Sequence, residues 1–259
     1  MNTIESTAVP VMTAGRLINA YLQEARAECL RYLRNPGFLL PTLLFPSVFY
    51  VMFGIFLAHS NSADAPRYLL ASYGTFGVMA PGLFGFGVSL ALERDTGLLT
   101  LKRALPMPPG AYLIGKMCMA VLVAAIISII LLCLATFVAG VSLPASRIAA
   151  FFVLQVLGVL PFCALGLLIG TLVKGQGAPG VVNLIYLPMA FLSGLWIPLP
   201  VLPSFLQSIA PLWPAYHLDR LALSVVGLGE GGDAIHALVL LGFTTVFLLI
   251  ATRRLRRYG

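Results

Sequence analysis

Long apolar stretches, separated by short polar or proline-rich segments, are the main pattern of the sequence. A helix needs about 20 apolar residues to cross the roughly 30 Å hydrocarbon core of a bilayer. Stretches of about this length occupy residues 38–58, 68–92, 112–140, 148–173, 178–197 and 234–252. None of them contains Asp, Glu or Arg. The pattern therefore predicts an all-α integral membrane protein with six transmembrane helices.

The composition supports a membrane protein over a soluble one. Of the 259 residues, 59% are hydrophobic and 10% are charged, whereas about 25% are charged in a typical soluble domain. The basic residues inside the apolar stretches are Lys116 and His236, each near the start of its stretch. We expect both side chains to extend to the membrane interface.

Lys and Arg collect on one side of the predicted membrane. Of the 16 Lys and Arg, thirteen lie in residues 1–37, 93–116, 174–177 and the tail, and three lie on the opposite side. Basic residues are retained in the cytoplasm, so both termini are predicted to be cytoplasmic. The predicted parts are a cytosolic N-terminal segment (1–36), a transmembrane domain (37–252) and a basic cytosolic tail (253–259). No basic cluster is interleaved with stacking aromatics, which argues against nucleic-acid binding.

Residues 16–34 show the periodicity of an amphipathic helix. Its apolar face consists of Ile18, Tyr21, Leu22, Ala25, Cys29, Tyr32 and Leu33. Its polar face consists of Arg16, Asn19, Gln23, Arg26, Arg31 and Arg34. We expect this helix to lie in the plane of the membrane interface. The alternative is a cytosolic helix that packs on another subunit.

Residues 93–110 form the predicted cytosolic loop between the second and third spans. We expect Asp95 or Thr96 to cap a short helix there. The leucines with the spacing of one apolar helix face are Leu98, Leu101 and Leu105. The prolines that end the helix are Pro106, Pro108 and Pro109. Such a helix suits docking in a groove of a partner, and an amphipathic connector lying on the membrane explains the same pattern equally well.

Residues 197–233 are too apolar for a free loop and too rich in proline for a spanning helix. The prolines are Pro198, Pro200, Pro203, Pro211 and Pro214. We predict short re-entrant external helices that dip into the outer leaflet between the fifth and sixth spans. An ordinary structured external loop is the alternative.

The run ERDTGLLTLKRALPMPPGAYLIGK resembles the cytosolic loop of the ABC transporter type-2 export permeases. The matching residues are Glu93, Gly97, Leu98, Pro106, Gly115 and Lys116. The Gly-Thr step common in that family is Gly97-Leu98 here, which is a departure from the pattern. The run FLSGLWIPLPVLPSFLQSIAPLWPAYHLDRL is similar to the segment at the end of the family's fifth span. Its matching residues are Ser193, Gly194, Pro198, Pro203, Pro211 and Pro214.

The resemblance implies a permease that works as a homodimer or heterodimer above two copies of an ATP-binding cassette ATPase subunit, in a bacterial inner membrane. The residues it implies for coupling to the ATPase are Glu93, Thr96, Gly97, Leu98, Leu101, Leu105 and Pro106. Those it implies for an external gate are Ser193, Gly194, Pro198, Pro203 and Trp213.

No Walker A, G-x-S-x-G or H-E-x-x-H pattern occurs in the sequence. We therefore expect a non-catalytic subunit with no bound cofactor or metal, whose partner holds ATP and Mg²⁺. The candidate substrate-pathway residues are Phe45, Tyr50, Phe53, Phe84, Tyr186 and Phe191. Their apolar character favours export of a hydrophobic or amphiphilic molecule, such as a drug-like compound or lipid. The alternatives are a permease for a polysaccharide or lipid-linked glycan and, from another class, an intramembrane enzyme or structural protein.

Overall fold

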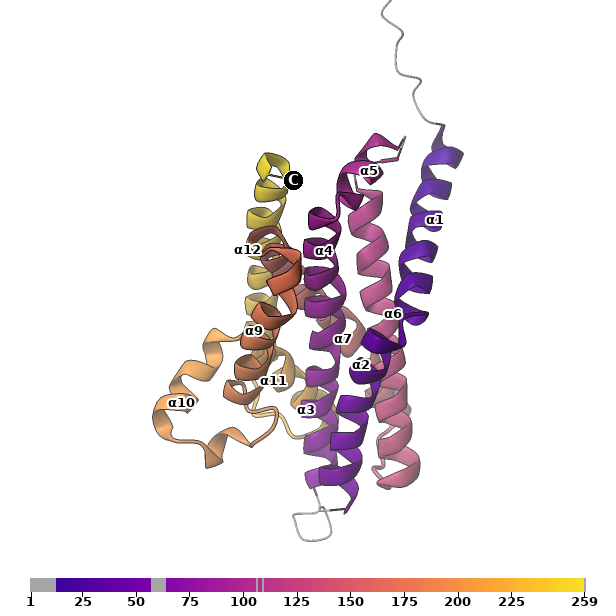
Figure 1. Cartoon of the computed structure of the whole chain (residues 1–259). Coiled ribbons are helices and arrows are strands. Elements are labelled where there is room, and N and C mark those ends of the chain that lie inside the picture. Colours follow the sequence, from indigo (N-terminus) through magenta and orange to yellow (C-terminus); the bar gives the residue numbers. More distant parts are fainter. Residues whose placement is uncertain (1–12, 57–63, 106, 109, 259) are drawn as a thin grey trace, which may run out of the picture.

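Long helices run side by side in one bundle, as the computed structural model of the chain shows (Figure 1). The structure describes residues 13–56, 64–105, 107–108 and 110–258. Within these residues, five helices are long and apolar enough to cross a membrane. They are Pro36–Phe56, Ala65–Asp95, Ala111–Val138, Ala145–Leu172 and Asp233–Leu255. The predicted all-α class is confirmed for the described part of the chain.

Several spans are composites of helical segments. The first joins α2 (Pro36–Phe49) to the π-helical η1 (Tyr50–Phe56). The second joins α3 (Ala65–Ala80), η3 (Pro81–Val88) and α4 (Ser89–Asp95). The next two consist of α6 (Ala111–Cys133) with η4 (Leu134–Val138), and of α7 (Ala145–Gly158) with α8 (Leu160–Leu172). The last is α12 (Asp233–Tyr258), which continues through most of the predicted tail.

The fifth predicted span is shorter in the structure than in the sequence pattern. The short η5 (Gly175–Gly177) leads into α9 (Ala178–Leu192), which has 15 residues. The helix stops because Gly194 takes a φ of 84°, in the left-handed region that favours glycine. The expected helical stretch to residue 197 is therefore wrong at its C-terminal end, and α9 is not among the five long spans.

Short helices follow α9 at the end of the bundle opposite α5 (Leu98–Ala104) (Figure 1). They are η6 (Leu199–Val201), α10 (Ser204–Ile209), η7 (Ala210–Leu212) and α11 (Pro214–Val226). Prolines stand at or just before their first residues, where a missing N–H costs no hydrogen bond. Of these helices, α11 packs against α3, α7 and α12 and closes this end of the bundle.

The N-terminal helix α1 (Ala14–Leu33) packs lengthwise along the first turns of α6 and runs in the same direction (Figure 1). Gly115 permits this approach, because a Cβ there would lie 3.0 Å from Cγ of Glu24. The helix therefore packs on α6 in the structure, and its expected position in the membrane interface stays a prediction. The residues that face α6 include acidic ones, and the predicted apolar residues Ile18 and Leu22 stay 59% and 62% exposed.

Glycines allow η3 and α8 to cross at backbone contact. An added Cβ at Gly166 would collide with the carbonyl oxygen of Gly82 and lie 3.2 Å from the amide nitrogen of Gly87. A Cβ at Gly170 would lie 2.7 Å from the carbonyl oxygen of Gly87. Backbone atoms cannot move aside as a flexible side chain would, so this crossing admits glycine alone.

Gly166→Ala is therefore expected to lower stability by about 1–3 kcal/mol through overpacking. Gly242→Ala is the matched control, because a Cβ at Gly242 of α12 meets no atom within 4 Å. That substitution is expected to be neutral or to stabilise by about 0.5–1 kcal/mol, since alanine is the better helix former. Thermal unfolding in detergent measures both, and equal effects at the two positions would refute the assigned crossing.

Candidate functional site

The turn between α4 and α5 decides how the predicted docking segment is presented. The helix α4 includes Glu93 and ends at Asp95, so the loop begins later than predicted. Gly97 has a φ of 75° and reverses the chain before α5. The expected cap from Asp95 or Thr96 is wrong, because Gly97 is the N-cap and no side chain caps α5.

The side chain of Asp95 has another role. Its Oδ2 accepts a hydrogen bond from the amide nitrogen of Gly175 at 2.6 Å. The neighbouring Arg94 donates through Nη1 to the carbonyl oxygen of Gly170 at 2.8 Å. The end of α4 is thereby fastened to the connection between α8 and α9, and α5 starts from a fixed point.

The short helix α5 turns one leucine inward and leaves others outward. Leu99 is 6% exposed, whereas Leu101 and Leu105 are 62% and 55% exposed. Leu98 is half-buried, and Leu105 is the first residue after the helix, with an extended backbone. The predicted residue Pro106 lies outside the described residues. We name the exposed side chains of Leu101 and Leu105 the leucine ridge.

Six charged side chains meet beneath α5, and we name them the charge cluster. They are Glu24, Glu28 and Arg31 of α1, Glu93 of α4, Lys102 of α5 and Lys116 of α6. Three carboxylates face three cations, so the formal charges of the cluster cancel. Buried charges are tolerated when they are paired in this way.

Lys116 lies at the centre of the charge cluster and is 0% exposed. Its Nζ is 3.0 Å from Oε1 of Glu93 and 3.2 Å from Oε2 of Glu28, and it donates to Oγ of Ser89 at 2.7 Å. The expectation that Lys116 extends to the membrane interface is wrong. The carboxylates of α1 and α4 meet its charge inside the protein, so the side chain does not need to reach water.

Tyr112 completes the surroundings of Glu93. Its hydroxyl donates to Oε2 of Glu93 at 2.6 Å. The ring centroid lies 4.8 Å from Nζ of Lys102 and 5.0 Å from Nζ of Lys116. Ammonium groups at this distance are attracted by the face of an aromatic ring, so Tyr112 stabilises both lysines while it binds Glu93, the carboxylate partner of Lys116.

Lys102 attaches α5 to α1 through two carboxylates. Its Nζ lies 2.5 Å from Oε1 of Glu24 and 2.9 Å from Oε1 of Glu28. Burial lowers the pKa of Lys102, but the hydrogen bonds that it donates to Glu24 and Glu28 outweigh burial and raise the pKa above its ordinary value. Lys102 therefore remains charged at neutral pH, and the attachment persists.

Arg31 binds the same carboxylates from the side of α1. Its Nη2 lies 2.6 Å from Oε2 of Glu28 and 2.5 Å from Oε1 of Glu93. Burial lowers the pKa of Arg31, and the charges of Glu28 and Glu93 more than compensate, so the pKa is raised. As a result α1, α4, α5 and α6 are joined by one set of ion pairs, and displacement of α5 would act on all of them.

The candidate pathway residues fall into separate places. Phe45, Phe84 and Tyr186 line one cavity of about 380 Å³ between α2, α3, η3 and α9, which we name the apolar groove. The ring of Tyr186 stacks on Phe76 at 5.0 Å and meets Phe84 edge-on at 5.5 Å. Its hydroxyl donates to the carbonyl oxygen of Phe76 at 3.2 Å.

The other three candidates do not line the apolar groove. Tyr50 is buried, and its hydroxyl donates to the carbonyl oxygen of Pro66 at 3.2 Å. Phe191 packs beside the small cluster formed by Leu199, Leu202 and Ala210. Phe53 lines a different cavity at the end of the bundle opposite α5.

The residues predicted for an external gate all lie in the segment that follows α9 or at its junctions. Ser193 is 0% exposed, and the carbonyl oxygen of Gly194 accepts from the Tyr68 hydroxyl at 3.3 Å. Pro198 lines the same cavity as Phe53. The two remaining residues, Pro203 and Trp213, immediately precede α10 and α11.

Sequence reasoning missed Glu24 and Glu28, which take part in four of the six ion pairs of the charge cluster. Their i, i+4 spacing within a basic, tyrosine-containing helix was the available signal. It also missed Asp219, which is 3% exposed on α11. No local pattern marks that residue, because it lies in a segment that the sequence assigns to the external side.

Among the described residues, no group of three His, Cys, Asp or Glu side chains is placed to hold a metal ion.

The part of the chain that resembles known proteins includes the charge cluster, α5 and the apolar groove. A family model described as "ABC-2 type transporter" matches residues 20–225. "Putative transport permease YvfS" of Bacillus subtilis (strain 168) is 28% identical over 239 residues, which cover 90% of this chain and 96% of that protein. "Inner membrane transport permease YhhJ" of Escherichia coli (strain K12) is 28% identical over 177 residues, which cover 66% of this chain and 46% of that protein.

Proposed function

The chain belongs to the ABC-2 type transporter family, and from this premise we propose that it is the transmembrane subunit of an ATP-binding cassette exporter. ATP and Mg²⁺ bind to a separate ATPase subunit, present in two copies, and this chain contributes no catalytic residue. A second permease subunit, identical or related, completes the pathway. The family and the relatives named as transport permeases support transport as the activity.

The observation that carries this proposal is the leucine ridge. It is an apolar surface at a polar end of the bundle, and the charge cluster fixes the helix that presents it. An exposed apolar patch on a rigid support is typical of a docking site. We propose that the ridge inserts into the ATPase subunit, and that Lys102 passes movement of α5 to α1 and α6. Glu93, Thr96, Gly97 and Leu98 position the ridge.

We further propose that the membrane domain crosses a bacterial inner membrane six times, with both termini in the cytoplasm. Two contacts support α9 as the remaining crossing. Gly175, just before α9, is hydrogen-bonded to Asp95 at one end of the second span. Gly194, just after α9, is hydrogen-bonded to Tyr68 near the other end. The relative named as an inner membrane permease supports the compartment.

The apolar groove is the proposed contact surface for the substrate. Aromatic and aliphatic side chains dominate its lining, with Thr42 and Asn183 as the polar exceptions. Such a surface offers contact area and few hydrogen-bond partners, which favours a hydrophobic or amphiphilic substrate over a glycan. The residues after α9, from Ser193 to Trp213, would close the pathway at the opposite end.

Phe84→Ala is expected to weaken stimulation of the ATPase by an amphiphilic substrate about tenfold, because one large aromatic contact is lost. The measurement is the half-stimulating concentration in nanodiscs that hold the permease and its co-expressed ATPase. Phe137→Ala is the matched control, since Phe137 is 84% exposed and does not line the groove. Stimulation by glycolipids but not by amphiphilic drugs would reverse the substrate assignment.

A further inference from the structure

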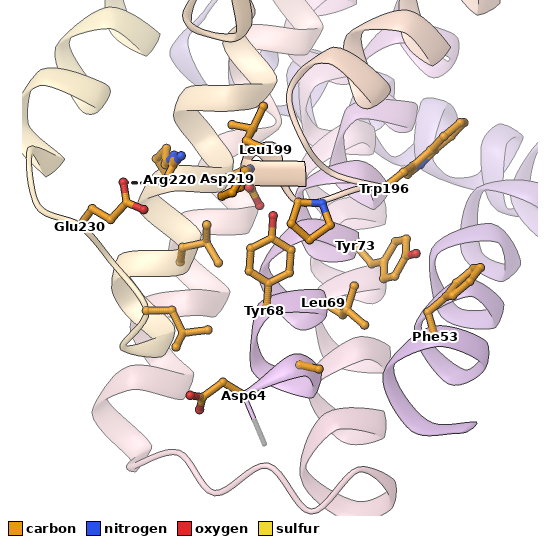
Figure 2. Close-up of a pocket in the computed structure, with 15 residues that line it drawn as sticks. Phe53, Asp64, Tyr68, Leu69, Tyr73, Trp196, Leu199, Asp219, Arg220 and Glu230 are labelled. Atoms are coloured by element: carbon orange, nitrogen blue, oxygen red, sulfur yellow. Dashed lines mark ion pairs between the residues drawn. The ribbon is translucent and has the colours of Figure 1, made fainter. Parts of the chain in front are cut away.

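A second cavity, of about 600 Å³, lies at the end of the bundle opposite α5 (Figure 2). The start of α3, the segment after α9, and α11 with the following loop form its walls. Its volume is that of a small-molecule site. It is separate from the apolar groove, and neither the family match nor the proposed coupling mechanism assigns it a role.

Asp219 of α11 contributes a buried carboxyl to this cavity. The residue is 3% exposed, and its Oδ1 has no hydrogen-bond partner among the described residues. The indole nitrogen of Trp196, on the opposite wall, is buried without a partner as well. An unpaired polar atom in a buried position is costly and points to a ligand that satisfies it.

Arg220, the cation nearest to Asp219 in the sequence, is engaged elsewhere. Its Nη1 lies 3.0 Å from Oε2 of Glu230 (Figure 2). Its guanidinium lies 5.2 Å from the ring centroid of Tyr216. Among the described residues, no ion pair reaches Asp219. The carboxyl therefore has space for a cation from outside the chain.

Aromatic rings surround the approach to this carboxyl. Phe53, Tyr68, Tyr73 and Trp196 all line the cavity, and Figure 2 shows the ring of Tyr68 beside Asp219. Aromatic faces attract organic cations and also bury apolar groups. A carboxylate beside one such ring, in a cavity that three more rings line, is a combination that recognises an ammonium group carrying an apolar body.

We propose that this cavity binds a protonated organic amine from the side of the membrane opposite α5, with its ammonium group on Asp219 and its apolar body against the aromatic rings. The ammonium donates to the unpartnered Oδ1. Binding of this kind requires neither ATP nor the partner ATPase, so it is tested independently of the proposed export function.

The protonation of Asp219 gives the site a pH dependence. Burial raises the pKa of Asp219 to about 7, against smaller opposing effects of the Ser72 hydroxyl and of Arg220. Tyr68 faces the carboxyl from α3, and Arg220 lies on the same helix. His217 and His236, on α11 and α12, hydrogen-bond each other through Nδ1 at 2.8 Å. The carboxylate fraction grows as pH rises through this range, so amine binding strengthens with pH.

Trp196 provides the measurement. The chain has 2 tryptophans, so Trp213→Phe leaves Trp196 as the only indole. The purified permease with this substitution, in nanodiscs without ATPase, is titrated with phenethylamine and with 2-phenylethanol. The alcohol matches the amine in size and donates a hydrogen bond, but carries no charge. We expect the amine to bind at least about tenfold more tightly, and more tightly at about pH 8 than at about pH 6.

Asp219→Asn, which keeps the shape of the side chain, is expected to remove the preference for the amine. Asp233→Asn is the matched control, because Asp233 is an exposed carboxylate at the same end and does not line the cavity. Equal affinity for amine and alcohol, or an unchanged preference in Asp219→Asn, overturns the proposal. If Asp219→Asn does not fold, the wild-type comparison still decides: absence of either the charge preference or the rise with pH refutes the site.

Discussion

The double substitution Leu101→Asp, Leu105→Asp is expected to abolish copurification of the ATPase subunit while leaving the permease folded. Both leucines are more than half exposed, so the chain itself loses little packing. Burying each of them in a partner would contribute about 1.5–3 kcal/mol. Loss of both corresponds to at least about a hundredfold in affinity, before the cost of desolvating two carboxylates is added.

The measurement is the amount of tagged ATPase that copurifies with the permease, together with ATP hydrolysis in nanodiscs. Thr100→Asp places one such charge at an exposed position of α5 outside the leucine ridge and is expected to retain the partner. Leu98 and Leu99 are unsuitable for this test, because they are half-buried and buried, and their substitution would also disturb the fold. Wild-type copurification of the double variant would show that the ridge does not dock the ATPase.

The five long spans could be predicted because they depend on local composition. An uninterrupted apolar run such as the one that becomes α6 can satisfy its backbone in a membrane only as a helix. The short helix α5 was also predicted from residues close together in the sequence, but its N-cap is Gly97 and not Asp95 or Thr96. The sequence did not show which side of α5 faces the protein. Leu99, which lies outside the predicted apolar face, is the buried leucine.

The charge cluster could not be predicted from the same information. It joins Glu28, Glu93 and Lys116, which are far apart in the sequence and meet only after α1 has packed along α6. A lone lysine near a helix end can either be buried in ion pairs or extend its ammonium group to water at little cost in free energy. The neighbouring sequence does not distinguish these two outcomes. The same holds for Asp219, whose burial depends on how α11 closes over α3.

These long-range contacts also connect the two functions that we propose for the α5 end of the bundle. In that proposal the leucine ridge provides affinity for the ATPase subunit. The charge cluster transmits the movement, because Lys102 links α5 to the carboxylates of α1. A docking helix without such a link would move independently of the bundle. The proposed coupling therefore requires the buried ion pairs, and we expect their loss to lower the stability of the folded state first.

Lys116→Met is accordingly expected to destabilise the protein by about 3–5 kcal/mol, a large part of the total stability of a typical domain. The substitution removes the cation whose Nζ lies within 3.2 Å of both Glu28 and Glu93, so both carboxylates stay buried with one cation fewer. The expected result is a strong decrease in the yield of monodisperse protein and in its unfolding temperature.

Lys116→Met combined with Glu93→Gln separates charge imbalance from simple loss of packing. The double variant keeps two carboxylates, Glu24 and Glu28, opposite two cations, Arg31 and Lys102, so the cluster is neutral again. The glutamine still accepts from Tyr112, whose hydroxyl contacts Glu93 at 2.6 Å. We therefore expect the double variant to recover much of the stability that the single variant loses. If it is no more stable than Lys116→Met alone, balance of charge is not what holds α1, α4 and α6 together.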